Sequence, residues 1–239
     1  MKPRSIQKPA LAFLVLICTC LCGLVFLLAY QQARESAISR LHDEQMIHAK
    51  QAAKGIEAFF GHWLTFLANA GQRRSIIRLD DEGKRQMEFI LQSHQQEIKG
   101  ITRVDQEGRI IHTLPYDPTL IGADISEQKH IREVIRTRRP VLSGVFDSVQ
   151  GFRAVALHVP VFDGQEFRGT LAVLLDFGAI SKSFLEEITV GDGGYAWMID
   201  RDGVELYCPV PGHTGRSVFA NCRDFPTILA MAGAMVKGN

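Results

Sequence analysis

The sequence has no excess of charge of either sign. Its 239 residues include 27 Lys and Arg against 26 Asp and Glu, which leaves a formal net charge of +1. A domain that binds nucleic acid usually carries a basic patch or stripe. Nothing in the composition indicates such a surface, so nucleic acid is not an expected partner.

Sequence signatures of catalysis are absent as well. There is no G-x-S-x-G, no H-E-x-x-H and no G-x-x-x-x-G-K-[ST], and the Gly-rich turn at Gly191 is too isolated to indicate a phosphate-binding loop. The eight His are scattered, and we find none at metal-ligand spacing from a Cys. The sequence therefore predicts no catalytic residue, no metal ligand and no cofactor.

Cysteine is scarce outside one apolar run. Three of the five Cys fall in that run, at positions 18, 20 and 22, where they act as small hydrophobic residues. The other two, Cys208 and Cys222, would lie in an oxidising compartment if the run crosses a membrane. They can then form a disulfide or remain unpaired, because a sequence does not report the distance between Cβ atoms.

The apolar run itself, Ala10–Tyr30, has no charge over 21 residues. At about 1.5 Å per residue, a helix of this length crosses a hydrocarbon core of roughly 30 Å. Basic residues precede it, and positive charges favour the cytoplasmic side. We expect a cytoplasmic segment over residues 1–9, a helix in the inner (cytoplasmic) membrane over residues 10–30, and a periplasmic or extracellular remainder. A cleaved signal peptide is the alternative, although its apolar core is usually shorter.

Residues 31–70 contain no Pro, and their apolar side chains recur every three or four positions, as in an amphipathic helix. We expect this helix to continue directly from the transmembrane helix. A further helix is predicted after it, capped by Asp80 or Asp81 and running to about Ile98, with Gly100 as its stop.

Two short stretches share the pattern apolar-Asp-x-acidic-Gly. VDQEGRI begins at Val104 and IDRDGVE begins at Ile199. In each stretch the Asp can bond its own backbone and the Gly accepts positive φ, which favours a tight turn between two strands. The two Asp residues, Asp105 and Asp200, are 95 positions apart. This spacing indicates a duplicated domain.

The first copy is predicted to be an α+β module with five antiparallel strands. The strands are expected in ITRVDQEGRIIHTL, which forms a hairpin, and in PVLSGVF, FRAVALHVPVF and FRGTLAVLLDF. A helix inserted after the second strand should have Ser126 as its N-cap and should end at Pro140. Asp163 and Gly164 supply the turn between the last two strands.

The second copy follows a short helix that we expect over Ile180–Ile188. It repeats the hairpin in YAWMIDRDGVELYCP, the loop in VPGHTGRSVF and the inserted helix in DFPTILAMAGAMVKG. No further strands follow within the 239 residues. We therefore expect the long helix and one complete module over residues 31–187, and the truncated start of a second module over residues 188–239.

Six stretches follow one another in a recognisable order: RVDQEGRIIHT, LIGADIS, KHIREVIRTRRPVLSGVF, ALHVPVFD, FRGTLAVLLDF and GGYAWMIDRDGVELYCPVPGHTGRS. In this order the chain resembles the double Cache (PAS-like) extracytoplasmic sensor domains of bacterial transmembrane receptors, from about Gln31 to the end. The resemblance implies a small-molecule site between the sheet and the inserted helix of the membrane-distal module.

The resemblance also implies a cytoplasmic output, for which we favour a sensor histidine kinase over a chemoreceptor or a diguanylate cyclase. We also expect a homodimer that forms through the long helices. A membrane-anchored extracytoplasmic enzyme or adaptor with a PAS-like core is the alternative from another class of function.

The candidate ligand site lies at the start of the inserted helix, where Lys129, His130 and Arg132 form a basic cluster. A helix N-terminus itself favours anions, so an anionic ligand is expected. A solvated first turn is the alternative. Many relatives carry an Arg or Tyr with aromatic neighbours here to hold a carboxylate, and this sequence instead reads Gln128-Lys129-His130.

Five further residues are candidates because their expected positions border the same cleft. Two lie on strands and one on the loop over the cleft, while the last two lie at strand ends: Ser143, His158, Tyr116, Arg153 and Asp176. For His158, a structural role in the core is as plausible as a ligand contact.

Overall fold

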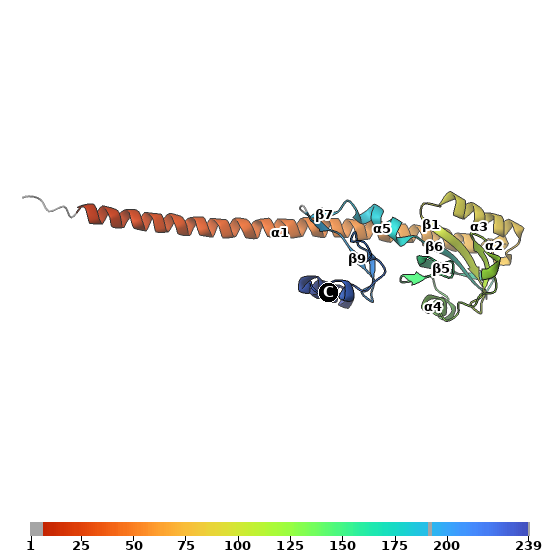
Figure 1. Cartoon of the computed structure of the whole chain (residues 1–239). Helices are drawn as coiled ribbons and strands as arrows, with labels where there is room; N and C mark the ends of the chain where they lie inside the picture. The colour runs from red at the N-terminus through yellow and green to blue at the C-terminus, as the bar shows by residue number, and fades with distance from the viewer. Residues whose placement is uncertain (1–6, 191–192, 239) are drawn as a thin grey trace, which may run out of the picture. The chain divides into compact units, whose positions relative to one another are not determined.

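The computed structural model describes residues 7–190 and 193–238, and the chain divides into two compact units, residues 1–51 and residues 52–239 (Figure 1). Residues 7–51 of helix α1 (Gln7–Gly71) make up the described part of the first unit, and the rest of the helix belongs to the second. Its side chains from Phe13 to Tyr30 are all exposed. Among the described residues, α1 is the one helix long and apolar enough to cross a membrane, with a mean hydropathy of 2.7 over 18 residues. An exposed surface that is apolar on every side fits a lipid environment.

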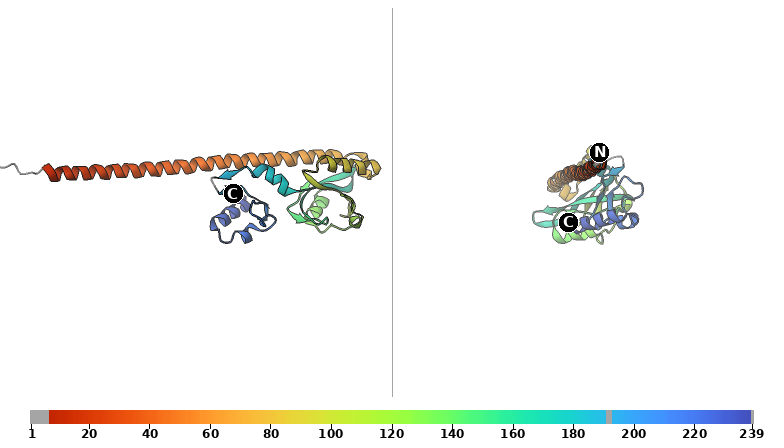
Figure 2. Two further views of the ribbon diagram at one scale, coloured as in Figure 1. Left: turned by 45° about the horizontal axis from the view of Figure 1, so that its top comes forward. Right: turned by 90° about the vertical axis from the view of Figure 1, so that its left-hand side faces the viewer.

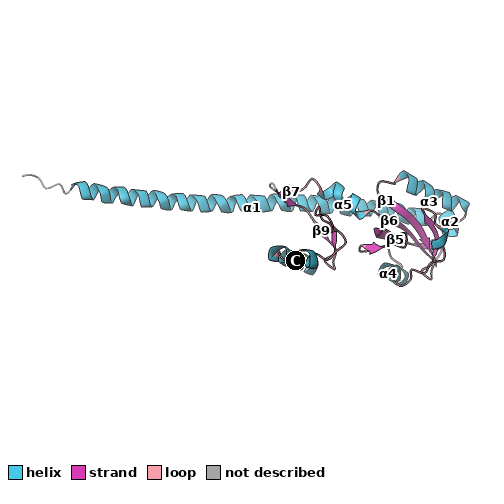
Figure 3. Cartoon of the chain, viewed as in Figure 1, coloured by secondary structure: helices cyan, strands magenta, loops and turns pink. Residues whose placement is uncertain are grey.

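An antiparallel sheet forms the centre of the second unit (Figure 3). Its strands lie in the order β2-β1-β6-β5-β3, and β4 also pairs with β5. Their bounds are β1 Ile98–Val104, β2 Ile110–Leu114, β3 Val141–Leu142, β4 Phe146–Asp147, β5 Arg153–Asp163 and β6 Glu166–Leu175. The structure therefore confirms the α+β fold class and the antiparallel sheet that the sequence predicts.

Helices lie on both faces of this sheet (Figures 1 and 2). Residues 52–71 of α1 and helix α3 (Asp81–Ser93) cover one face, where Trp63, Leu67 and Met87 are buried against aliphatic side chains of β5 and β6. Helix α4 (Lys129–Thr137) covers part of the other face and follows the short 3-10 helix η1 (Pro118–Leu120). The sheet thus has one face packed into a large core and one face that α4 only partly covers.

A buried arginine fastens the short helix α2 (Arg74–Arg78) to the sheet. The Arg103 side chain is 1% exposed, and its Nε and Nη2 atoms donate to the carbonyls of Ile76 and Ile77, at the C-terminal end of α2. Nη1 donates to the carbonyls of Val104 and Thr170 at 3.0 and 2.8 Å, and Nη2 also reaches the carbonyl of Arg168. Burial lowers the pKa of Arg103 to about 10, partly offset by Asp105, so the guanidinium stays charged at neutral pH.

After helix α5 (Phe177–Leu185), the chain enters a second, smaller set of elements. Two two-stranded ribbons come first and two helices follow: β7 Thr189–Val190, β8 Gly194–Tyr195, β9 Met198–Ile199, β10 Glu205–Tyr207, α6 Val218–Asn221 and α7 Pro226–Lys237. We call residues 98–175 the first repeat and residues 194–238 the second repeat.

The turns of the two repeats share one hydrogen-bond pattern. Asp105 Oδ1 accepts from the backbone N–H groups two and four residues later, at 3.0 and 2.7 Å. Asp200 Oδ1 does the same, at 2.9 and 2.8 Å. The Gly that closes each turn has positive φ, 89° at Gly108 and 76° at Gly203. The two Asp-Gly motifs therefore form turns with the same backbone hydrogen bonds, as a duplication would require.

The loop after each hairpin is held in the same way. Gly122 donates its N–H to the carbonyl of Ile110 at 2.7 Å, and Gly215 donates to the carbonyl of Glu205 at 2.6 Å. Both glycines have positive φ. Ile110 of the first repeat and Glu205 of the second repeat therefore occupy equivalent positions.

Three element boundaries differ from the sequence prediction. Helix α3 ends at Ser93 rather than near Ile98, because Ile98 already pairs with Leu175 in the sheet. Gly100 is a strand residue and not a helix stop. A Cβ at Gly100 would lie 2.8 Å from the carbonyl oxygen of Leu114, so the close approach of β2 requires glycine there. Helix α5 spans Phe177–Leu185 rather than Ile180–Ile188.

The inserted helix and the strand after it also differ from the prediction. Helix α4 begins at Lys129, so Ser126 is not its N-cap; Ser126 instead donates its N–H to Asp124 in a turn. PVLSGVF forms two short strands, β3 and β4, rather than one. The break follows from Ser143, whose Oγ accepts the N–H of Ala156 at 2.8 Å and so replaces a regular ladder bond with a side-chain bond.

We predict that Gly169→Ala will strongly destabilise the first repeat. Gly169 has φ of 93°, and a Cβ there would lie within the van der Waals radius of the Val104 carbonyl oxygen, against the strand that carries Arg103. We expect a loss of about 4 kcal/mol or more in the free energy of unfolding. Gly164→Ala is the matched control in the same hairpin, because its φ is also positive but no atom lies within 4 Å. It should cost about 1–2 kcal/mol.

Urea denaturation followed by the fluorescence of the buried Trp63 measures both variants. Equal losses for the two substitutions would contradict the close approach of the backbones at Gly169.

Candidate functional site

Near the middle of β5 and β6, the strands place bulky side chains on one face of the sheet and small or polar ones on the other. On β6, Leu171, Val173 and Leu175 belong to the large core under α1 and α3. The alternate residues of the same strand, Thr170 and Ala172, face the α4 side with His158 of β5. Because side chains alternate along a strand, these two smaller residues of β6 lie on the side that faces α4, where they leave space above the sheet.

The pairing register brings three of these alternate residues into one row. Thr102 of β1 lies opposite Ala172 of β6, and Ala172 lies opposite His158 of β5. Ala172 has the smallest side chain of the row and stands at its middle. The row therefore has polar groups at both ends and a gap at its centre.

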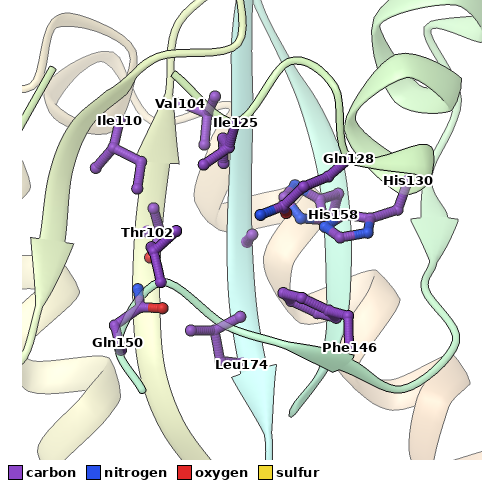
Figure 4. A pocket seen from close by; sticks show the side chains of 12 residues that line it. Thr102, Val104, Ile110, Ile125, Gln128, His130, Phe146, Gln150, His158 and Leu174 are labelled. Carbon is purple, nitrogen blue, oxygen red and sulfur yellow. The ribbon is translucent and has the colours of Figure 1, made fainter. Parts of the chain in front are cut away.

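A cavity of about 20 Å³ lies over this row (Figure 4). Its lining comes from the sheet, from the start of α4 and from the segment around β4: Thr102, Val104, Ile110, Ile125, Gln128, His130, Phe146, Val149, Gln150, His158, Ala172 and Leu174. None of these lining side chains is a carboxylate, an ammonium or a guanidinium. A volume of roughly 10–15 Å³ holds one water, so a molecule of amino-acid size can enter only if the covering segments move outward.

Two histidines lie side by side in this cavity (Figure 4). The ring centroids of His130 and His158 are 5.2 Å apart, and the His130 ring is 4.5 Å from the ring of Phe146. The Nδ1 atom of His158 is 3.1 Å from Thr170 Oγ1. His130 stands at the second position of α4, and the first turn of that helix aims it at the sheet.

Burial keeps both rings neutral. It lowers the pKa of His130 to about 4 and the pKa of His158 to about 3, and the proximity of His130 adds to the shift of His158. The pair therefore offers one donor and one acceptor on each ring at neutral pH.

Amide and hydroxyl groups complete the polar lining. Thr102 Oγ1 is 2.9 Å from Thr113 Oγ1, which in turn accepts from Gln150 Nε2 at 3.2 Å. Gln150 lies on the opposite side of the cavity from the histidines, whereas Gln128 lies beside them (Figure 4). The arrangement can bind a small polar molecule through neutral donors and acceptors at two ends.

The structure brings two of the predicted site residues together, His130 and His158. The neighbouring basic residues point to solvent instead. Lys129 Nζ lies 3.6 Å from Asp202 Oδ2, and Arg132 Nη1 lies 3.4 Å from Glu127 Oε2.

The other predicted site residues that the structure describes are not part of the cavity lining. Ser143 Oγ bonds the backbone, Tyr116 is 61% exposed near the His112 ring, and Asp176 Oδ2 is 3.5 Å from Lys99 Nζ. The side chain of Arg153 lies outside the described residues.

Sequence reasoning missed most of the lining. The pattern of β6 carried a usable signal, because Ala172 interrupts the aliphatic run from Leu171 to Leu175. Phe146 and Gln150 had no such signal, since they lie on a broken strand and a loop.

Comparison with known proteins agrees with this fold. Residues 66–176 match the family model described as HK/GC/Chemotaxis protein-like, sensor domain. This part of the chain is therefore similar to receptor sensor domains of that kind, and it has the Cache (PAS-like) fold. No curated protein matches the chain at a significant level.

Solved structures with the same fold include ligand-binding domains of receptors. An extracellular ligand binding receptor from Desulfohalobium retbaense is 25% identical with a TM-score of 0.61, over 74% of this chain and 33% of that one. The chain thus spans about one third of that receptor's length. The ligand-binding domain of the Pseudomonas aeruginosa amino acid chemoreceptor PctC, in complex with GABA, is 16% identical with a TM-score of 0.59, over 73% of this chain and 78% of that one.

A further example is the ligand-binding domain of the Pseudomonas fluorescens chemoreceptor CtaA, in complex with L-serine. It is 15% identical with a TM-score of 0.58, over 73% of this chain and 74% of that one. At such identities these two chemoreceptor domains show the fold alone.

We predict that the two histidines make stability depend on pH. Their folded pKa values lie below the unfolded value of about 6.5, so the unfolded chain binds more protons between pH 6.5 and about 4. Stability is therefore full above pH 6.5 and falls as the pH drops below it. Between pH 7 and pH 5 His158 should contribute a loss of about 2 kcal/mol, which His158→Gln should remove.

Urea denaturation at the two pH values measures this difference. His48→Gln, which changes an exposed histidine of α1, is the control and should keep the full pH dependence. If His158→Gln keeps the wild-type pH dependence, the ring is not held neutral by burial.

Proposed function

We propose that residues 31–187 bind a small polar molecule outside the cytoplasm and form the input of a membrane signal-transduction receptor. The observation that carries this proposal is the cavity under α4, whose lining combines polar and apolar side chains, whereas the opposite face of the sheet packs into an apolar core. The match to a sensor-domain family supports it.

The ligand would contact the two histidines and the two glutamines. His130 and Gln128 lie at the start of α4, and Gln150 follows β4, so the ligand would touch both segments that cover the cavity. Because the cavity is about 20 Å³, binding of a molecule of amino-acid size requires these segments to move. Binding would thus favour one of two packings of α4 and β4 on the sheet.

The pH dependence of affinity, which the two histidines would determine, distinguishes a charged ligand from a neutral one. A carboxylate beside His130 and His158 would raise their pKa values from about 4 and 3 and draw protons into the site. Affinity for an anion should therefore increase as the pH falls from 7 to 5. A neutral ligand would not gain affinity over that range. We propose an anionic ligand, because α4 begins at the cavity and a helix N-terminus favours negative charge.

The remaining parts follow from the topology of such receptors. We propose residues 1–9 in the cytoplasm, residues 10–30 in the inner membrane and residues 188–239 as the start of a second module. We propose a homodimer and a histidine kinase output, with a chemoreceptor or a diguanylate cyclase as the alternatives. The coding sequence beyond Asn239 tests the output, since each of these classes has its own cytoplasmic domain.

The binding prediction is that His130→Ala weakens ligand affinity. A thermal-shift screen of the full chain in detergent against amino acids and small carboxylates identifies the ligand, and calorimetry gives its dissociation constant. Loss of a hydrogen bond to a charged ligand should cost about 1.5–3 kcal/mol, or about ten- to a hundredfold in affinity. Lys129→Ala is the neighbouring comparison, because that side chain is exposed and paired with Asp202.

The two variants separate the possible sites. If only His130→Ala binds more weakly, the ligand lies in the cavity; if both do, the basic cluster takes part as well. Wild-type binding by His130→Ala and by His158→Ala would contradict the cavity as the ligand site.

The topology prediction is that an alkaline phosphatase fused after Gly151 is active and a cytoplasmic reporter fused there is silent. The positive charges before the apolar run favour a cytoplasmic N-terminus. The reverse pattern of reporter activity would overturn the proposed orientation.

A further inference from the structure

A cluster of metal-ligating side chains lies in the second repeat, apart from the cavity of the first. One donor atom each from Glu205, His213 and Cys222 lies within 4.8 Å of the other two. They come from β10, from the loop after it and from the residue that ends α6. The Sγ atom of Cys208 lies 3.7 Å from His213 Nδ1, so a second sulfur adjoins the same imidazole nitrogen.

Two separations in the cluster fit the edges of a tetrahedral zinc site. With bonds of about 2.0–2.1 Å to nitrogen and oxygen and about 2.3 Å to sulfur, tetrahedral ligands lie roughly 3.3 Å apart for N and O, and roughly 3.6 Å apart for N and S. His213 Nδ1 is 3.3 Å from Glu205 Oε2 and 3.7 Å from Cys208 Sγ. These two edges therefore already have the lengths of a zinc site, and a donor atom of Cys222 lies within 4.8 Å of both Glu205 and His213.

A buried carboxylate at this position is not required by the fold. Glu205 is 2% exposed, and its equivalent in the first repeat, Ile110, is a core residue that is 1% exposed in the same hydrogen-bonded frame. Burying a carboxylate is unfavourable unless a counter-charge and hydrogen bonds compensate. Among the described residues, His213 is the only ion-pair partner of Glu205, and it is a counter-charge only when protonated.

The surroundings orient the cluster as they do in metal sites. Asn221 Nδ2 donates to Glu205 Oε2 at 3.0 Å and to the carbonyl of His213 at 3.2 Å. One amide thus holds the carboxylate and the histidine-bearing loop together. Metal ligands in proteins are commonly positioned by hydrogen bonds of this kind.

We propose that Glu205, His213 and Cys222, with Cys208 as the fourth ligand, bind a Zn²⁺ ion. Thiolate and imidazole ligands favour zinc over magnesium or calcium, which take oxygen ligands. The two thiols release their protons to solvent as the sulfurs bind the ion. The ion would join β10, the loop after it and the end of α6. It would add to the backbone hydrogen bonds between the hairpin and that loop. Both cysteines are free thiols in the structure.

The test measures zinc bound to the full chain, purified in detergent with its thiols verified as reduced. We expect one tightly bound Zn²⁺ per chain by elemental analysis, and sulfur-to-metal charge-transfer absorption when Co²⁺ replaces it. Glu205→Gln, His213→Ala and Cys222→Ser should each weaken zinc affinity by about 100-fold or more, because loss of a ligand should exceed the 10- to 100-fold effect of losing an outer partner. Asn221→Ala should show that smaller effect.

Two controls keep the result specific. A variant with Ser at positions 18, 20 and 22 removes the cysteines of α1 and should keep the ion, and so should His130→Ala in the first repeat. Urea denaturation followed by Trp63 fluorescence checks that the ligand variants keep the first repeat folded. Because Glu205→Gln preserves the shape of the side chain, it tests the carboxylate even if Cys222→Ser disturbs the local core.

Three results would overturn the proposal. One is a reduced wild-type protein that binds no zinc. Another is zinc that stays bound with unchanged affinity in Glu205→Gln and His213→Ala. The third is a Cys208–Cys222 disulfide in the protein isolated from cells, because that bond would consume the sulfur ligands.

Discussion

The guanidinium of Arg103 joins three backbone segments inside the second unit: the end of α2, the end of β1 and the start of β6. Five carbonyl groups accept from it, so the charge is accommodated at 1% exposure by backbone oxygen atoms. The hydrogen bonds of Arg103 determine which face of β1 lies toward α2 and α3. Since side chains alternate along a strand, it also fixes Thr102 and Val104 toward α4 and therefore determines the lining of the cavity.

The two repeats show how one backbone frame holds two different interiors. Asp105 and Asp200 make the same turn bonds, and Gly122 and Gly215 hold the same loop. At the shared interior position the first repeat has Ile110, which borders an uncharged cavity, and the second has a carboxylate among cysteine and histidine side chains. Backbone hydrogen bonds specify the frame, so the interior is free to differ.

The chemistry of the ligand cavity follows from what burial does to its titratable groups. His130 adjoins exposed basic residues in sequence, yet its ring is buried against Phe146 and its pKa is lowered to about 4. The positive charge of the helix start therefore stays at the surface, in pairs such as Lys129 with Asp202. A ligand in this cavity would therefore meet neutral groups, and the site would acquire charge only by taking up protons.

The sequence by itself determined the long N-terminal helix, the antiparallel sheet and the two Asp-Gly turns. These depend on local patterns: an uncharged apolar run, alternation along strands and Asp-Gly turns whose bonds lie within five residues. It also indicated His130 and His158. The end of α3 and the break between β3 and β4 could not be predicted, because pairing with distant strands decides them.

Only the tertiary structure decided which polar groups meet. The row Thr102, Ala172 and His158 exists through strand register, and the cluster of Glu205, His213 and Cys222 through a loop that folds back on its hairpin. No short-range spacing encodes either, since their members come from segments that are brought together by the sheet and by backbone bonds between loops. The burial that lowers the pKa of the two cavity histidines has the same origin, because it depends on the packing of α4 over the sheet.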